Sequence, residues 1–495
     1  MKPTQNPWSA SRTTCSGLLC LFLTVGLVAP VGSAAGAQQE RRGSPQYIEE
    51  NRQIRRDKFD LILPQIMRAR GIDMWIHVMR NAIRDPFGAQ DLGGTSGVFI
   101  FTDRGGDRIE RAIVGRRWGA SQRQRTGSDY VDPIEELDAY DIIGDPVFVG
   151  EPVSSPMTEY DYRFKGLREF VEARAPGRIA VNYRENLATW ATSSRTDDGI
   201  SHIDYLLLTE ELGETYAGRL VSSEYLIMDY NVSPVASEVE LLEKMRAYEV
   251  ELVHQAFADI VPGVTKNSEV GEIGDGEVDI VVFRRMRTGL SQRGRSEGWE
   301  NTVVQGGDIL AAPSQGMFAY VLRDGESEPP AEIKKLWVQY LTIDRILAET
   351  IRAGLTPREI IKSYKRKLAD AGIIVRDPQL HMAQPKNDFP VYSAGYDPGK
   401  TQLTLDLHGK GKGARERKFD IYLGPRMGSY GPDWTFDVPL SPHHHFVLEY
   451  FFYMPSPAGE GEDQYLLFWN HEQAIATASG VDYLSPPQRE LVLIR

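Results

Sequence analysis

The pattern of secondary-structure signals changes near residue 230, and this change most constrains what the chain can fold into. Before it, short apolar runs with strand character recur between helical and glycine-rich stretches, at 74–78, 98–102, 111–114 and 178–181. Such alternation favours a mixed sheet covered by helices. After it, long amphipathic helices come first and strand-like runs follow, which is typical of an α+β domain. The sequence therefore predicts an α/β domain followed by an α+β domain.

Helix signals flank this change. Apolar spacing predicts helices over 47–70, with Pro64 bending the helix or starting a new one, over 236–260 and over 331–353. A further helix opens at Thr356-Pro357, with Thr356 as its N-cap. Strand-like runs then occupy 402–407, 446–453, 465–469, 474–477 and 491–494.

The N-terminus predicts export. Residues 1–14 carry Lys2 and Arg12 and no acid, residues 15–32 are almost wholly apolar, and Ala35-Gly36-Ala37 has the small-x-small pattern of a cleavage site. A membrane anchor is the alternative, but the apolar run is short and Pro30 interrupts it. We expect a signal peptide over 1–37, a flexible lead-in over 38–46, domains over 47–232 and 233–495, and a secreted or periplasmic protein.

Charge and cysteine content narrow the classes of function. The formal net charge is −13, which argues against nucleic acid and membrane surfaces as partners. Both cysteines, Cys15 and Cys20, lie in the predicted signal peptide, so the mature chain has neither a disulfide nor a cysteine nucleophile. After residue 40 no apolar run is long enough to span a bilayer.

Several stretches, in order, resemble one family of enzymes. They are IMRARGIDMWIHVMR (66–80), VFIFTDRGG (98–106), RIAVNYREN (178–186), PGVT (262–265), VVQGGDIL (303–310), AGLTPREI (353–360), PLSPHHHFVLEYFFY (439–453) and WNHEQAIATASGVDYLSPPQREL (469–491). Together they resemble the creatinase/prolidase, or pita-bread, metallopeptidases. The resemblance implies a creatinase-like N-terminal domain, a pita-bread C-terminal domain and a peptide substrate. By analogy with relatives it also implies a homodimer.

The resemblance also implies the chemistry. In the family, two Asp, one His and two Glu hold two divalent metal ions, and the water between the ions attacks the peptide bond. Two ions clamp the attacking and leaving oxygens and make hydroxide available near neutral pH. Carboxylate and imidazole ligands suit Mn, Co, Fe or Zn.

Two carboxylate ligands map near the C-terminus. Glu449 is the only charged residue in an apolar strand-like run, where burying it without a partner is costly. Glu472 has about the spacing of the second family glutamate, but counting back from Gly480 puts His471 in that place. Successive strand residues point to opposite faces, so only one of the two can join Glu449. Glu449 and Glu472 are the candidate catalytic residues by this mapping.

The histidine ligand maps less directly. The stretch before Gly424-Pro425, where many relatives carry it, has no histidine, so His408 is the candidate. Asp406 lies two residues earlier, hence on the same face of a strand. Ordinary polar residues at a strand end are the alternative. The His443–His445 run is expected at a loop-to-strand turn with its side chains alternating in direction.

The two aspartate ligands are the main departure from the family. No Asp or Glu occurs between Asp308 and Arg323, and the intervening hairpin of the relatives is deleted, so by this mapping both aspartate ligands are missing. Asp308 corresponds to a turn residue of the relatives. Two hypotheses follow. One is an exported metallopeptidase of the Xaa-Pro aminopeptidase or dipeptidase type that uses a divalent metal. The other is a catalytically inactive relative that binds peptides or a protein.

Overall fold

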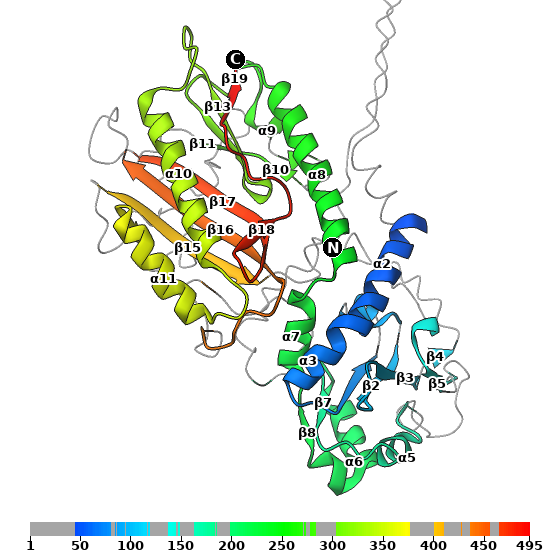
Figure 1. Cartoon of the computed structure of the whole chain (residues 1–495). Coiled ribbons are helices and arrows are strands. Elements are labelled where there is room, and N and C mark those ends of the chain that lie inside the picture. The colour runs from blue at the N-terminus through cyan, green and yellow to red at the C-terminus, as the bar shows by residue number, and fades with distance from the viewer. Residues whose placement is uncertain are drawn as a thin grey trace, which may run out of the picture.

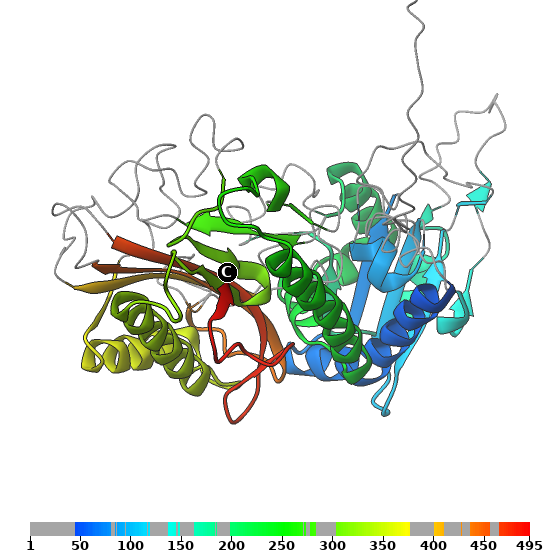
Figure 2. The same cartoon turned by 90° about the horizontal axis from the view of Figure 1, so that it is seen from above.

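The computed structural model describes much of the chain after residue 44. The described residues are 45–80, 85, 87–94, 96–115, 117–118, 137–144, 147–148, 163–183, 185, 199–270, 272–273, 278–283, 303–376, 400–409, 427, 436–455 and 465–495. The predicted signal peptide and most of the lead-in lie outside them. The described chain forms an N-terminal and a C-terminal half that lie side by side (Figures 1 and 2).

A six-stranded mixed sheet forms the centre of the N-terminal half. Its order is β5-β3-β2-β1-β7-β8. β2 pairs antiparallel with both β1 and β3. On one side β7 pairs parallel with β1 and β8 pairs parallel with β7, and on the other side β5 pairs parallel with β3. The bounds are β1 Met74–Met79, β2 Gly97–Asp103, β3 Ile109–Val114, β5 Ile142–Ile143, β7 Ile179–Val181 and β8 Leu220–Ser222. A separate pair joins β4, Arg117–Trp118, to β6, Val147–Phe148.

Helices cover both faces of this sheet. One apolar core joins Phe59, Leu63 and Tyr230 to Trp75 and Phe101, and a second core on the other face joins Leu167 and Leu208 to the even-numbered residues of β1. This is the predicted α/β arrangement. The helices are α2 Pro45–Asp57, α3 Leu63–Ala69, α5 Leu167–Glu172, α6 His202–Ala217 and α7 Glu224–Val232, with short turns of helix η2 Gly88–Leu92 and η3 Leu137–Ala139.

The helix predicted over 47–70 is interrupted as Pro64 suggested. A π-helical segment η1, Lys58–Ile62, separates α2 from α3, and Pro64 occupies the first turn of α3. Proline fits there because its missing N–H would have no partner in the first turn of a helix.

The C-terminal half is the predicted α+β arrangement. A five-stranded sheet has the order β14-β15-β16-β17-β18, and a four-stranded sheet has the order β11-β12-β13-β19. The helices α10 and α11 lie against one face of the five-stranded sheet (Figures 1 and 2), where a single large core joins them to alternate residues of β15 and β16.

The bounds in this half are α8 Ala236–Ala258, α9 Asn267–Val270, α10 Ala331–Thr350, α11 Pro357–Asp370, β9 Glu272–Ile273, β10 Val278–Asp279, β11 Val281–Phe283, β12 Ile309–Ala312, η5 Pro313–Gln315, β13 Met317–Val321, β14 Ile373–Val375, β15 Thr401–Gly409, β16 His444–Pro455, β17 Tyr465–Ala476, β18 Val481–Tyr483 and β19 Val492–Ile494. Thr356 caps α11 as predicted, and Glu359 completes a capping box with it.

One strand prediction was wrong. The runs at 465–469 and 474–477 form one continuous strand, β17, which pairs with β16 along its whole length. The polar residues between the runs do not break the strand because they find partners across it. Asn470 donates to the Leu448 carbonyl, and Gln473 bonds to His445.

A buried ion pair joins the two halves where α7 leads into α8. Lys58 of η1 is fully buried, and its Nζ lies 3.1 Å from Glu238 Oε2 at the start of α8. The same Nζ donates to the Tyr230 carbonyl at 2.8 Å. A small apolar cluster of Tyr47, Ile54, Val235 and Leu241 packs beside it.

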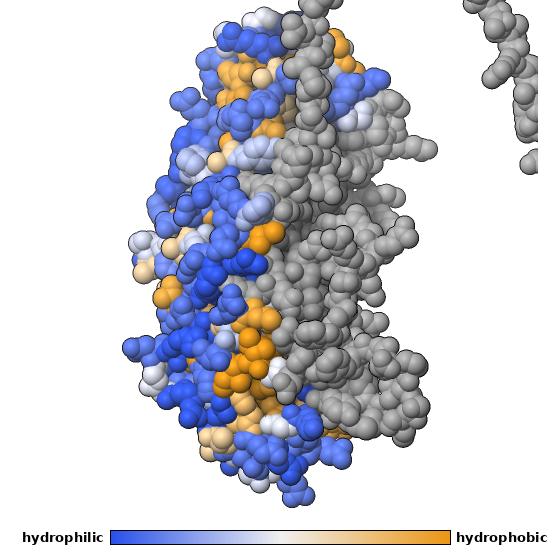
Figure 3. All heavy atoms as spheres, turned by 90° about the vertical axis from the view of Figure 1, so that its right-hand side faces the viewer, coloured by the Kyte–Doolittle hydropathy of each residue, from blue (hydrophilic) through white to orange (hydrophobic). Residues whose placement is uncertain are grey.

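The described surface is mainly hydrophilic on the side of the molecule that Figure 3 shows. Large apolar side chains that remain exposed come from several parts of the chain, for example Leu61, Ile143, Ile203 and Val264. Among the described helices, none combines the length and the hydropathy needed to cross a membrane.

Candidate functional site

The candidate site is a row of residue positions across three strands of the five-stranded sheet. Glu449 of β16 pairs with Asp406 of β15 on one side and with His471 of β17 on the other. Directly opposed residues of antiparallel strands lie on the same face. The register therefore places Asp406, Glu449 and His471 in one row, on the face that we call the Glu449 face.

Glu449 and His471 approach each other within this row. His471 Nε2 lies 3.8 Å from Glu449 Oε2, and both side chains are largely buried. Trp469 lies beside His471 with its ring 6.2 Å away, and Trp469 stacks on Phe451 with the ring centroids 5.6 Å apart. The pair thus has the partly exposed Trp469 ring next to it, and the buried Phe451 supports that ring.

A polar pair continues the Glu449 face toward the start of β16. His445 Nε2 and Gln473 Oε1 are 3.1 Å apart, and both positions share the face of Glu449 by alternation. His408 lies opposite Val447 and so occupies the same face. The structure gives the strand positions of Asp406 and His408, while their side chains lie outside what it describes.

Glu472 lies on the other face, under the helices. It pairs with Leu448, whose neighbours are the apolar side chains of α10 and α11. Its carboxylate packs against Gly316, where an added Cβ would come within 2.5 Å of Oε2. Burial raises its pKa well above the usual value for Glu, and the nearby Asp344 raises it further, while Arg246 and Arg489 oppose the shift.

Of the two alternatives at 471 and 472, the register therefore brings His471 to Glu449. Glu472 points away from that residue, so it has no access to a reaction on the Glu449 face. Among the described residues, no group of three or more His, Cys, Asp or Glu side chains lies close enough to hold a metal ion.

The hairpin of β12 and β13 has an apolar interior. β12 and β13 are buried throughout and are joined by the short turn η5. Asp308 precedes β12, and its carboxylate accepts a hydrogen bond from the backbone N–H of Gln305 at 2.8 Å. Asp308 thus stabilises the turn before the strand. No carboxylate of this hairpin faces Glu449, since the sequence from 309 to 323 holds none.

Among the described residues, Glu449 and His471 bring together one carboxylate and one imidazole on this face. These are donor types that Mn, Co, Fe or Zn accept, and the register puts the backbone position of Asp406 beside Glu449. A two-ion centre would need further carboxylates that the β12–β13 hairpin does not supply.

A second polar cluster was not predicted from the sequence. Asp344 of α10 is buried, accepts a hydrogen bond from Tyr483 and lies 3.8 Å from Arg489. Burial raises the pKa of Asp344 above its usual range, and Tyr483 and Arg489 oppose this shift. The sequence signal was present, because Asp344 directly follows Ile343 on a helix face that is otherwise apolar.

Comparison with protein-family models and with curated proteins gives no match. Among solved structures, the chain is similar to X-Pro aminopeptidase from Thermotoga maritima, with 14% identity over 87% of this chain and 100% of that chain, at a TM-score of 0.49. It is also similar to Xaa-Pro dipeptidase from Bacillus anthracis, with 15% identity over 89% of this chain and 99% of that chain, at a TM-score of 0.45. A third similar structure is prolidase from Pyrococcus horikoshii, with 15% identity over 88% of this chain and 99% of that chain, at a TM-score of 0.43. These are proteins of the kind that the sequence motifs resemble.

Proposed function

We propose that the chain binds peptides on the Glu449 face and hydrolyses them as a metal-dependent peptidase of the Xaa-Pro aminopeptidase or dipeptidase type. The observation that carries the proposal is the Glu449–His471 pair, with Asp406 in register beside it. The motif resemblance supplies the reaction type. A homodimer is proposed on the same analogy.

Glu449, His471 and Asp406 would hold a single divalent ion. When bound, such an ion supplies hydroxide near neutral pH and polarises the carbonyl of the peptide bond. Glu449 has a second oxygen, Oε1, that can take a proton from water and return it to the leaving amine. The partly exposed Trp469 ring, which stacks on the buried Phe451, offers an apolar contact to the side chain of the peptide.

A second candidate is a peptide-binding protein without catalysis. The β12–β13 hairpin favours it, because that hairpin lacks the carboxylates of a two-ion centre. The peptide would occupy the same face in both cases. The two candidates therefore differ in turnover and metal content, and not in the place of binding.

The deciding experiment measures metal content and turnover together. The full chain is loaded with Mn, Co or Zn, desalted, and assayed with Ala-Pro and Ala-Pro-Ala. We expect one equivalent of metal and proline-dependent cleavage, both lost in Glu449→Gln. The matched control is Glu328→Gln, whose side chain is 71% exposed on another part of the molecule.

Other outcomes assign the protein differently. Peptide binding without metal or cleavage would establish the binding protein and reject the peptidase. Two equivalents of metal would contradict the single-ion site. Retention of metal and activity in Glu449→Gln would reject the Glu449 face altogether.

We also propose that residues 1–37 direct export and are removed. The support is the charged, apolar and small-residue sequence of this segment. N-terminal sequencing of the protein recovered outside the cytoplasm should begin at Gln38. An intact N-terminus in the membrane fraction would instead establish an anchor.

A further inference from the structure

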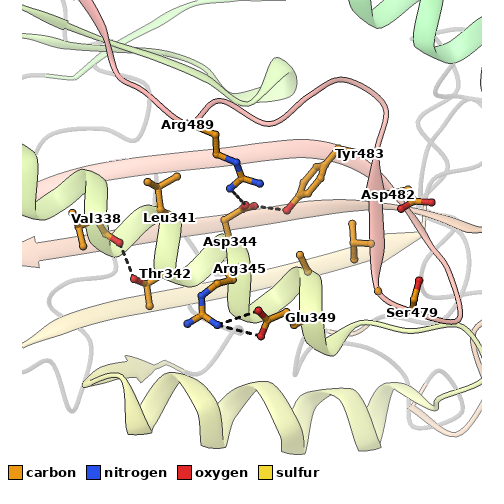
Figure 4. Close-up of a pocket in the computed structure, with 13 residues that line it drawn as sticks. Val338, Leu341, Thr342, Asp344, Arg345, Glu349, Ser479, Asp482, Tyr483 and Arg489 are labelled. Carbon is orange, nitrogen blue, oxygen red and sulfur yellow. Dashed lines mark hydrogen bonds and ion pairs between the residues drawn. The ribbon is translucent and has the colours of Figure 1, made fainter.

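A pocket of about 690 Å³ lies between α10 and β18. The exposed side of α10 forms one wall, and β18 with the turn before it forms the other, as Figure 4 shows. The volume is in the range of pockets that hold small molecules. Because α10 covers the face opposite Glu449, this pocket is separate from the candidate peptidase site.

The backbone holds Arg489 in place at this pocket. Trp337 Nε1 donates to the Arg489 carbonyl at 3.1 Å. The preceding Gln488 bonds to both the amide and the carbonyl of Phe318, at 2.7 and 2.8 Å. The segment carrying Arg489 is therefore fixed at two successive residues, although it is not part of a helix or strand.

A buried acid orients the Arg489 side chain. Arg489 Nη1 lies 3.8 Å from Asp344 Oδ2, and the Asp344 side chain is only 3% exposed. Tyr483 donates to the other oxygen of Asp344, and Figure 4 shows it approaching the carboxylate from a different side. The Arg489 side chain itself is 62% exposed. A guanidinium held from behind in this way can present its outer N–H groups to a carboxylate.

The rest of the pocket combines an apolar wall with charges that are already paired. Val338 is 61% exposed on α10, and Leu341, Ala348 and Val481 continue the apolar lining. Arg345 binds both oxygens of Glu349, at 3.1 and 3.2 Å. Tyr483 lies between Arg489 and Asp482 in the view of Figure 4. Of the two arginines that line the pocket, Arg345 is thus paired with the exposed Glu349, whereas the partner of Arg489 is the buried Asp344.

We propose that this pocket binds a small organic anion, a carboxylate on an apolar chain. The carboxylate pairs with Arg489, and the chain lies against Val338 and Leu341. The pairing exchanges water around an oriented guanidinium for a charge-assisted contact, and the chain removes exposed apolar surface from water. The proposal does not depend on peptidase activity.

The test uses the full chain and hexanoate as the probe, with binding followed by calorimetry and by ligand-observed NMR. Arg489→Gln should weaken hexanoate binding by about tenfold or more, since it removes a charged hydrogen-bond donor. Val338→Asp should weaken it as well, by placing an acid on the apolar wall. The matched control is Arg366→Gln, an exposed arginine on α11 away from the pocket, which should bind as the unchanged chain does.

Hexylamine and hexanol separate the role of charge from that of the chain. Hexanoate should bind more tightly than both. Equal or tighter binding of hexylamine would overturn the anion assignment, because it would make Asp344 or Asp482 the recognising group. No hexanoate binding, or binding unaffected by Arg489→Gln in a variant with an unchanged circular dichroism spectrum, would overturn the site.

Discussion

His444 shows how one residue can set the acid sensitivity of the fold. It is fully buried at the start of β16, with its ring over Phe446 and with neither ring nitrogen hydrogen-bonded within the described chain. Burial, with a smaller contribution from His445, lowers the pKa of His444 from 6.5 to about 3. Inside the fold this imidazole stays neutral where an exposed one would carry a charge.

Stability should therefore fall as the pH drops below about 6.5. The unfolded chain binds a proton at His444 between pH 6.5 and 3 whereas the folded chain does not, which disfavours folding by about 2 kcal/mol at pH 5. His444→Leu should remove this part of the pH dependence. Urea unfolding at pH 7 and pH 5 measures it, with the exposed His202→Gln as control. An equal loss in His444→Leu and the unchanged chain would contradict the prediction.

Glu472 gives the opposite pH dependence. Because its pKa in the fold is raised, the folded state holds a proton that the unfolded state releases above about pH 4.3. Stability contributed by this group is thus lost as the pH rises. Glu472→Gln should raise the melting temperature at pH 7 by about 2 °C or more, and less at pH 4. A lower melting temperature at pH 7 would show that the ionised carboxylate is stabilising.

The choice between His471 and Glu472 could not be made from the sequence, for a simple physical reason. A strand has two faces, and the phase of alternation is fixed only by the partner strand. The partner in this case is β16, where Glu449 meets His471 and Leu448 meets Glu472. The lone acid at Glu449 was recognisable because an apolar run surrounds it, but its cross-strand neighbours were not.

Elements with strong local signals were predicted well. The helices α10 and α11 begin where the sequence indicated, because an apolar stripe and the Thr356 capping box are local features. β17 was read as two strands because its middle, Asn470 to Gln473, is polar. The partners that stabilise this middle, His445 and the Leu448 carbonyl, come from another strand.

The turn between β12 and β13 should depend strictly on glycine. Gly316 has a φ of +64°, and an added Cβ would also collide with the Glu472 carboxylate. We expect Gly316→Ala to cost about 2 to 4 kcal/mol. Gly325→Ala is a matched control, with a φ of +80° and no atom within 4 Å of the added Cβ, and should cost about 1 kcal/mol. Chemical denaturation compares them, and equal losses would show that the collision is relieved without cost.

At the scale of the whole molecule, each half has its own cores, and the Lys58–Glu238 pair lies where the halves meet. The sequence predicted the two halves from their different element patterns. It could not predict this pair, because its members are far apart in the chain.

Breaking this pair on one side should be costly. Lys58→Met removes the Lys58 charge from beside the buried Glu238, which we expect to destabilise the protein by about 3 to 5 kcal/mol. The double variant Lys58→Met with Glu238→Leu should recover most of this loss, since replacing a whole buried pair by apolar groups is often neutral. Urea unfolding of the unchanged chain, the two single variants and the double variant gives the interaction energy between the two residues. Additive losses in the double variant would show that the two residues do not interact.

The same contact limits how the sequence can vary during evolution. We expect a neutral residue at 58 to be tolerated best when 238 is also neutral, and a reversed pair to need both changes together. Chains descended from a common ancestor should therefore show correlated residues at these two positions, with single replacements rare. The N-terminal half cannot drift independently of the helix that begins the C-terminal half.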